Sequence, residues 1–324
     1  MRRIVRAAGL ALVLLLASGA TRVQAEEGAR LVPVDTLASA RLVDPAGLAV
    51  DVFGRVWVSD ATLHRVVRFT ADGALLDETG ALGSDTGLFR RPGALAPAGA
   101  LGVAVLDREN RRVVVYDHHL RRLSGGVDWG REPLADRLGR VDPVALATDR
   151  GGALHVADAD RDRVLEFDFA GAFVREWGGY GGRAGGFNGL AALAGDGGGR
   201  FVAVERPRAR ARRGAPEDSS AGRSRVQWFE AGGRVTRTVW TAPWAAGAGE
   251  TGIVVAIAAD GRVALAAERS GEVVVLARDG REIVRARGLA QPRALAFDAD
   301  GRLLVGEAGA ARVVRWAIAL PAPE

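Results

Sequence analysis

The sequence predicts an all-β fold, a six-bladed β-propeller whose blades are four-stranded antiparallel sheets. One unit of four short apolar runs recurs along the chain, and its copies begin at spacings of 47, 51, 47, 62 and 40 residues. Repeats of this period with four strands each are typical of propellers, because a single such sheet leaves both apolar faces exposed and a closed ring buries them. The six copies begin at Pro45, Pro92, Pro143, Leu190, Gly252 and Pro292.

The first repeat, residues 44–80, shows the pattern of one blade. Its apolar runs are three or four residues long, rich in Val and Leu, and separated by turns that contain Asp and Gly, such as Asp72-Gly73. Runs of this kind are typical of short antiparallel strands joined by tight turns. We therefore expect strands at 47–50, 56–58, 66–69 and 74–76.

Each copy also carries an acidic residue at the end of its second strand. In four copies an Arg follows five residues later and opens the third strand; in the fourth copy Arg225 follows after 20 residues, and in the fifth Glu272 stands near that place. We interpret the acid as a structural group and not a catalytic one: it can accept backbone N–H groups of the next turn, and it can form a bidentate ion pair with the Arg. The acids are Asp60, Asp107, Asp158, Glu205, Glu268 and Glu307, and the arginines that follow after five residues are Arg65, Arg112, Arg163 and Arg312.

Ring closure is expected to use the N-terminal part of the mature chain. The last copy ends near Trp316–Leu320 with only three strands, whereas the apolar segment Arg30–Ser39 precedes the first copy and belongs to none. A propeller leaves few exposed sheet edges when its termini meet in one blade. We therefore expect Arg30–Ser39 to supply the missing outer strand, which makes residues 26–324 one domain.

The segment of residues 45–66 reads P-x-G-L-A-V-D-x-x-G-x-V-W-V-S-D-x-x-x-H-R-V and resembles the NHL repeat. Residues 142–178 match it about as well, and the fourth to sixth copies match less closely because Glu replaces the turn Asp. The resemblance spans the six copies and implies a propeller. It implies little about function, since members of that family bind RNA or proteins or act as enzymes.

Residues 1–25 have the features of a bacterial secretory signal peptide. Arg2, Arg3 and Arg6 precede an apolar stretch at 7–20, and V-Q-A predicts cleavage after Ala25, with Ala20 as an alternative site. The stretch is shorter than the roughly 20 residues of a spanning helix, so an uncleaved anchor is the second interpretation. We expect an exported protein, periplasmic or secreted, with no transmembrane segment after cleavage.

The charge of the mature chain argues against a nucleic-acid partner. Four of the 44 basic residues lie in the signal, which leaves 40 basic against 39 acidic residues, a net charge of +1. All basic residues are Arg, and no Cys is present for disulfides or thiol chemistry. We expect a monomer that binds no nucleic acid.

The residues just before the first strands are expected to form a polar ring at one mouth of the central channel. Asp44 and Asp142 have the carboxylate oxygens that Ca²⁺ prefers, whereas Arg91 could neutralise one of them and leave no cation site. Ordinary turn chemistry before Pro is the third interpretation. The predicted ligand-binding residues are Asp44, Arg91, Asp142, Asn188 and Gln291, with Ca²⁺ as the one candidate cofactor.

An Arg-rich insertion, residues 205–225, separates the second and third strands of the fourth copy. Such turns lie at the same end of a propeller as the connections between blades, which makes that end rich in loops. The insertion is either a tolerated surface excursion or a basic arm that docks an acidic protein, an anionic glycan or a phospholipid headgroup. The arm residues are Arg206, Arg208, Arg210, Arg212 and Arg213.

No pattern of catalytic or metal-ligating residues stands out. The four His residues lack the spacing of a zinc site, and no G-x-S-x-G segment is present. We therefore predict a non-enzymatic binding scaffold for a protein, glycan or small ligand on the loop-rich face. The alternative is a divalent-metal-dependent lactonase, hydrolase or lyase with its site in the central channel.

Overall fold

The computed structural model describes residues 29–37, 41–206, 223–242 and 252–320. The predicted signal peptide and the greater part of the Arg-rich insertion, including Arg208, Arg210, Arg212 and Arg213, lie outside these residues. No helix within the described part of the chain is long and apolar enough to cross a membrane.

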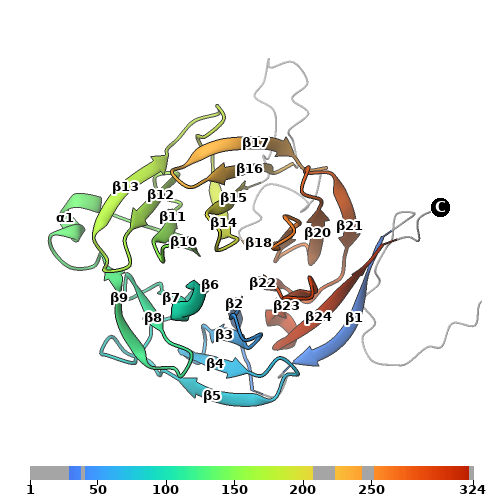
Figure 1. Cartoon of the computed structure of the whole chain (residues 1–324), viewed down its shortest axis with the longest axis horizontal. Helices are drawn as coiled ribbons and strands as arrows, with labels where there is room; N and C mark the ends of the chain where they lie inside the picture. The colour runs from blue at the N-terminus through green and yellow to red at the C-terminus, as the bar shows by residue number, and fades with distance from the viewer. Residues whose placement is uncertain (1–28, 38–40, 207–222, 243–251, 321–324) are drawn as a thin grey trace, which may run out of the picture.

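The described strands form six separate four-stranded sheets arranged in a ring, as predicted (Figure 1). In five blades the strands are paired in chain order from the inside of the ring outward. Blades one and two contain β2 (Pro45–Val50), β3 (Val56–Asp60), β4 (Arg65–Phe69) and β5 (Leu75–Thr79), then β6 (Pro92–Pro97), β7 (Val103–Asp107), β8 (Arg112–Tyr116) and β9 (Arg122–Asp128).

The next blades repeat this order, and a short helix, α1 (Leu134–Leu138), lies between blades two and three. Blade three contains β10 (Pro143–Thr148), β11 (Leu154–Asp158), β12 (Arg163–Phe167) and β13 (Phe173–Gly178). Blades four and five contain β14 (Leu190–Gly195), β15 (Arg200–Glu205), β16 (Arg225–Glu230) and β17 (Arg234–Trp240), then β18 (Ile253–Ile257), β19 (Val263–Ala267), β20 (Glu272–Leu276) and β21 (Glu282–Ala286).

The sixth blade joins the two ends of the chain, which confirms the predicted closure. It contains β22 (Pro292–Phe297), β23 (Leu303–Glu307) and β24 (Arg312–Ala319), and β1 (Arg30–Leu37) is its outermost strand. β1 pairs antiparallel with β24 from Arg30 opposite Ala319 to Leu37 opposite Val313. Backbone hydrogen bonds therefore hold the ring shut where no covalent connection exists.

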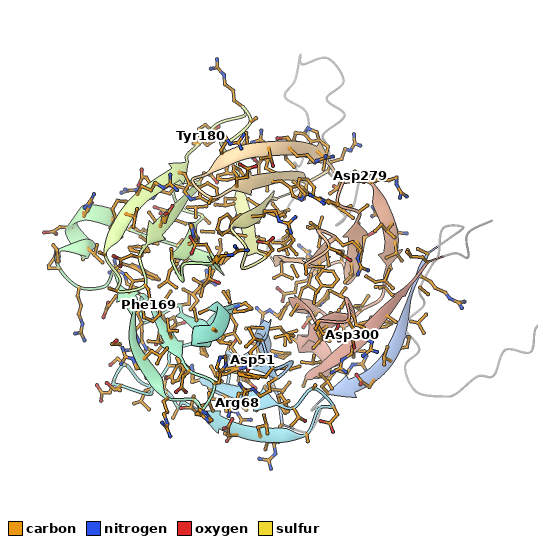
Figure 2. All side chains as sticks on the ribbon, in the orientation of Figure 1. Asp51, Arg68, Phe169, Tyr180, Asp279 and Asp300 are labelled. Carbon is orange, nitrogen blue, oxygen red and sulfur yellow. The ribbon has the colours of Figure 1, made fainter. Side chains whose placement is uncertain are left out.

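The core consists of six apolar clusters, one at each contact between neighbouring blades, and Figure 2 shows the side chains that fill these contacts. The contact between blades one and two buries Trp57 against Val103 and Val105. The contact that closes the ring packs Val67 of blade one with Leu304 of blade six. Each blade thus buries both faces only because it has a neighbour on either side.

The predicted acid–Arg pairs form in four of the six blades. Arg163 Nε lies 2.9 Å from Asp158 Oδ2, and the corresponding distance from Arg112 to Asp107 is 2.8 Å. The Arg residue of the fourth pair, Arg225, bonds Glu205 across the insertion. The described pairs are Asp107–Arg112, Asp158–Arg163, Glu205–Arg225 and Glu307–Arg312.

The predicted pair is absent in blade one, and the predicted position of the acid was wrong in blade five. In blade one, Asp60 accepts backbone N–H groups, from Val43 among others, while Arg65 pairs with Glu78 on the outer strand. In blade five, strand pairing places Ala267 opposite Glu272, where the other blades have the acid opposite the Arg. Glu268 therefore lies one residue beyond the position that the sequence comparison gave it.

Candidate ligand-binding site

A cavity of about 470 Å³ lies on the axis of the ring, between the innermost strands of all six blades. Figure 1 shows these strands, β2, β6, β10, β14, β18 and β22, around the centre. The walls are almost entirely Ala, Val, Leu and Gly, because the second to fourth residues of the inner-strand segments are small or branched, with Arg293 of blade six as the exception. Ala46, Gly93, Val144, Ala191 and Val254 illustrate this lining.

The charged residues of the described lining all lie at one mouth, where the innermost strands begin. They are Arg91, Arg108, Asp142, Arg206, Glu268 and Arg293. The lining at the opposite end comes from the last residues of the innermost strands, among them Val50, Pro97, Gly195, Ile257 and Phe297, and carries no charged side chain. The cavity is therefore polar at one end and apolar along its length and at the other.

The register between the first and second strands explains why charges gather at this mouth. The first residue of the inner strand opposes the last residue of the second strand, as in Pro45 opposite Asp60 and Pro143 opposite Asp158. In five blades the residue after the second strand then bonds back to the residue before the inner strand, as Arg206 N–H donates to Gly189 O. In blade two the bond lies one residue further out, from Glu109 N–H to Arg90 O. Both flanking positions consequently lie at the mouth.

The sequence predicted that the residues before the inner strands lie at the mouth, but it did not predict that the residues after the second strands lie there too. That second ring contains Arg108, Arg206 and Glu268, together with the small residues Ala61, Ala159 and Ala308. Arg206 was predicted only as part of the basic arm, and Glu268 only as a blade acid. In five blades this position is the residue directly after the acid, whereas in blade five it is Glu268 itself. The strand register is therefore needed to identify the position.

A three-residue ion-pair chain occupies the side of the mouth formed by blades five, six and one. Arg293 Nη1 lies 2.7 Å from Asp44 Oδ1, and Arg293 Nε lies 3.2 Å from Glu268 Oε1. Asp44 is buried, while Arg293 is half-buried and lines the cavity. The guanidinium contacts both carboxylates, and the two contacts hold the Arg293 side chain in place.

Blades two and three are linked by a second ion pair at the mouth. Arg108 Nη2 lies 2.9 Å from Asp142 Oδ1, with both side chains exposed to solvent. Arg91 reaches outward to Glu109, with 3.6 Å between Nε and Oε1, and its backbone N–H donates to His64 Nδ1 at 3.0 Å. These exposed pairs contribute little to stability, but each carboxylate neutralises an arginine of the mouth.

Arg206 differs from the other arginines that line the cavity. Its side chain is exposed, and within the described residues its guanidinium has neither an ion pair nor a side-chain hydrogen bond. Its backbone is held on both sides, by the bond from its own N–H to Gly189 O and by the buried pair between the preceding Glu205 and Arg225. The mouth thus contains an arginine with an anchored backbone and no charged partner in the described part of the chain.

The structure brings some of the predicted ligand-binding residues together and separates others. Arg91 and Asp142 line the cavity, and Asp44 lies behind Arg293. Asn188 and Gln291 are exposed and are not part of the lining. The neutralising partners of the two aspartates are Arg293 and Arg108, not Arg91 as the sequence suggested.

The described residues contain no cluster of three or more His, Asp and Glu side chains with the geometry of a metal site. Asp44 and Asp142, the candidate calcium ligands, each face a guanidinium. The carboxylates of the described lining therefore interact with arginines of neighbouring blades. Calcium binding stays a prediction that only titration can test.

Comparisons with known proteins support the fold. No family model and no curated protein sequence matches this chain. Among solved structures, a streptogramin B lyase has a TM-score of 0.58 at 10% identity, over 90% of this chain and 98% of that one.

Two further structures show the same likeness. A gluconolactonase from Xanthomonas campestris has a TM-score of 0.56 at 14% identity, over 90% of each chain. The β-propeller domain of Cps50 (Swd1) from Myceliophteria thermophila has 0.57 at 9%, over 89% of this chain and 100% of that one. At such identities these likenesses show that this chain shares their β-propeller fold, and nothing about its activity.

Proposed function

We propose that this protein is a non-enzymatic binding propeller whose central cavity holds a small ligand that enters from the loop-rich end. One observation carries the proposal: a cavity of about 470 Å³ combines apolar walls with charged residues at a single mouth. Ligand sites in proteins are typically cavities of about 300–1,000 Å³ with mostly apolar linings and a few polar groups that orient the ligand.

The arrangement assigns a role to each part of the cavity. The Ala, Val and Leu walls offer apolar surface, so a ligand gains affinity by removing its own apolar body from water. The charged mouth orients the ligand. The polar end of the ligand pays the smallest desolvation cost at the mouth, because hydrogen-bond donors and acceptors are already in place there. The rigid ring leaves the walls preformed, which reduces the entropic cost of binding.

The surrounding predictions fit a binding protein that works outside the cytoplasm. We propose that residues 1–25 direct export and that the blades are NHL-like repeats, which rests on residues 45–66 and 142–178. The arginines of the insertion beyond Arg206 would extend the basic character of the loop-rich end. None of these proposals is needed for a ligand to occupy the cavity.

The test fills the cavity without disturbing the blades. Gly93 lines the cavity, and a Cβ atom added there would meet no atom within 4 Å, so Gly93→Leu places a side chain in open space. Gly182 is its matched control, because an added Cβ is equally free there but the residue lies in an exposed loop outside the lining.

The probe is Nile red, a neutral apolar dye whose fluorescence rises in an apolar site. We expect wild type and Gly182→Leu to bind the dye with similar affinity and Gly93→Leu to lose binding, with all three equally stable to heat. Equal binding by Gly93→Leu, or no binding by wild type, would contradict the proposal.

The enzymatic alternative has one observation in its favour. Asp142 and Glu268 present carboxylates at the mouth of the cavity, where a substrate would meet them. A divalent-metal lactonase or lyase requires such oxygen ligands. Calorimetric titration with Ca²⁺ of wild type and Asp142→Ala decides between the two functions: heat in wild type that the variant lacks would support the enzyme, and no heat in either would remove the metal-dependent candidate.

A further inference from the structure

We infer that the ligand of the central cavity carries a carboxylate on an apolar body, and that Arg206 binds this carboxylate. The inference rests on the proposed function, because it names the chemical class of ligand for the same cavity. The arginines at the mouth differ in whether a carboxylate partner lies beside them.

Three of the four arginines of the described lining already have carboxylate partners. Arg293 bonds Asp44 and Glu268, Arg108 bonds Asp142, and Arg91 reaches Glu109. The guanidinium of Arg206 has no such partner among the described residues. Arg206, on blade four, is therefore the one arginine of the described lining whose guanidinium has no carboxylate partner among the described residues.

The position of Arg206 suits an anionic group that arrives from solvent. The side chain is exposed and lines the cavity, so it contacts both the entry route and the apolar walls. An arginine always carries its charge and presents five N–H donors in a planar fork, which matches the two oxygens of a carboxylate. Beside an apolar cavity this interaction is screened less than it would be in open water.

The backbone of Arg206 is anchored before any ligand arrives. The preceding residue, Glu205, is 1% exposed and paired with Arg225, and Arg225 in turn donates to carbonyl groups of the loop before blade four, including Gly182 O at 2.6 Å and Gly186 O at 2.8 Å. The N–H of Arg206 bonds Gly189 O at 2.9 Å. This anchoring reduces the entropy lost on binding and distinguishes Arg206 from an arginine on a free loop.

The neighbouring positions of the same ring leave room for a head group. Ala61, Ala159 and Ala308 occupy the equivalent places in blades one, three and six, so three of the six positions carry only a methyl group. Below this ring the cavity is apolar along its length. A ligand with a carboxylate at one end and a hydrocarbon body fits this order of surfaces, with the carboxylate at the mouth.

The experiment compares three probes of equal chain length and different heads: octanoate, octanol and octylamine. Binding to wild type, Arg206→Gln and Arg183→Gln is measured by calorimetry at low ionic strength. Arg183 is the matched control, because it is exposed at the same end of the propeller, lies outside the cavity lining and has no ion pair among the described residues. Thermal melting confirms that each variant is folded.

We expect wild type and Arg183→Gln to bind octanoate more tightly than octanol, and octylamine most weakly. Arg206→Gln should bind octanoate about tenfold more weakly, as expected for loss of a charge-assisted contact, while its affinity for octanol stays unchanged. Arg206→Lys should restore part of the affinity, because it keeps the charge and loses the fork.

The outcomes separate this inference from the proposed function. If octanol and Nile red bind while Arg206→Gln leaves octanoate affinity unchanged, the carboxylate inference is wrong and the cavity remains a binding site. If the neutral probes also fail to bind, the proposed function itself is wrong. Preference for octylamine in wild type would likewise overturn the inference, since it would assign the mouth to Glu268 or Asp142.

Discussion

Arg225 and Glu205 form a buried ion pair with 2.8 Å between Nε and Oε1, although 20 residues separate them in the chain. Asp158 and Arg163 form the equivalent pair in blade three across only five residues. The insertion in blade four therefore leaves the pairing of its second and third strands intact. Loops enter a propeller at the ends of strands, where they need not disturb the sheet.

These arginines also hold the loops between blades. Arg112 donates to Ser84 O at 2.7 Å and to Leu88 O at 2.6 Å, in the loop that joins blades one and two. Arg225 makes the same kind of contact with the glycine-rich loop between blades three and four. A guanidinium can bind its carboxylate and still have donors left for carbonyl groups.

Replacing the acid of a buried pair should destabilise the protein without affecting ligand binding. Asp158 is fully buried, and its Oδ1 also accepts from the N–H groups of Asp142 and Asp160 at 3.0 and 3.1 Å. Asp158→Ala leaves Arg163 without this partner, at an expected cost of about 3 kcal/mol in the free energy of unfolding.

Glu230→Ala, which removes an exposed pair with Arg234, is the control and should change stability little. Chemical denaturation of both variants measures the difference. Equal midpoints for Asp158→Ala and wild type would contradict the structural role.

Replacing Arg112 by Lys should loosen the loop of residues 81–91. Lysine keeps the charge and pairs with Asp107, but it lacks the planar fork that reaches two loop carbonyls at once. Trypsin can cut after Arg90 in this loop but not after Arg91, which Pro92 follows. We therefore expect faster cleavage after Arg90 in Arg112→Lys, while the thermal midpoint changes modestly. Unaltered cleavage kinetics would show that the loop holds its conformation without the arginine.

Two cavity-lining glycines should respond in opposite ways to a methyl group. A Cβ atom on Gly47 would lie 2.2 Å from Gly93 O, which accepts a 2.6 Å hydrogen bond from Ser59 Oγ. Gly47→Ala therefore forces blades one and two apart, and we expect a loss of about 1–3 kcal/mol in the free energy of unfolding. Gly93→Ala meets no atom within 4 Å and should be nearly neutral; similar melting of the two variants would contradict this prediction.

His155 should make the protein less stable in mild acid. The side chain is 1% exposed, 4.4 Å from the Phe201 ring between centroids, and burial lowers its pKa despite the opposing charges of Glu166 and Asp149. The unfolded chain therefore binds a proton near the usual pKa of about 6.5, whereas the folded chain binds it only at lower pH. The stabilisation that neutral His155 contributes is therefore complete above the usual pKa of about 6.5. It is lost as the pH falls from there toward the lowered pKa of the folded state.

Thermal midpoints of wild type and His155→Leu at pH 7.5 and pH 5 measure this effect. We expect the midpoint of wild type to fall more between the two values than that of the leucine variant, which has no proton to bind. A parallel fall in both proteins would assign the acid sensitivity to other groups.

The architecture could be predicted because it depends on patterns that repeat within the chain. The P-x-x-L-A segments, the acids at the ends of the second strands and the unassigned strand at Arg30–Ser39 together indicated six blades and their closure. Each of these signals is local, and a propeller combines them by repeating one contact six times. The structure has the closing strand at Arg30–Leu37, with the neighbouring residues 38–40 outside the described part of the chain.

The site at the mouth depended on contacts that the sequence does not record. Asp44 and Arg293 are 249 residues apart and meet only because the ring closes. Glu268 lines the cavity because the inner pair of blade five runs without the register shift seen between Pro45 and Gly47 in blade one. A shift of one residue along a strand changes the face on which a side chain lies. The sequence thus determined the blades, and tertiary packing decided which charges face the cavity and which of them remain unpaired.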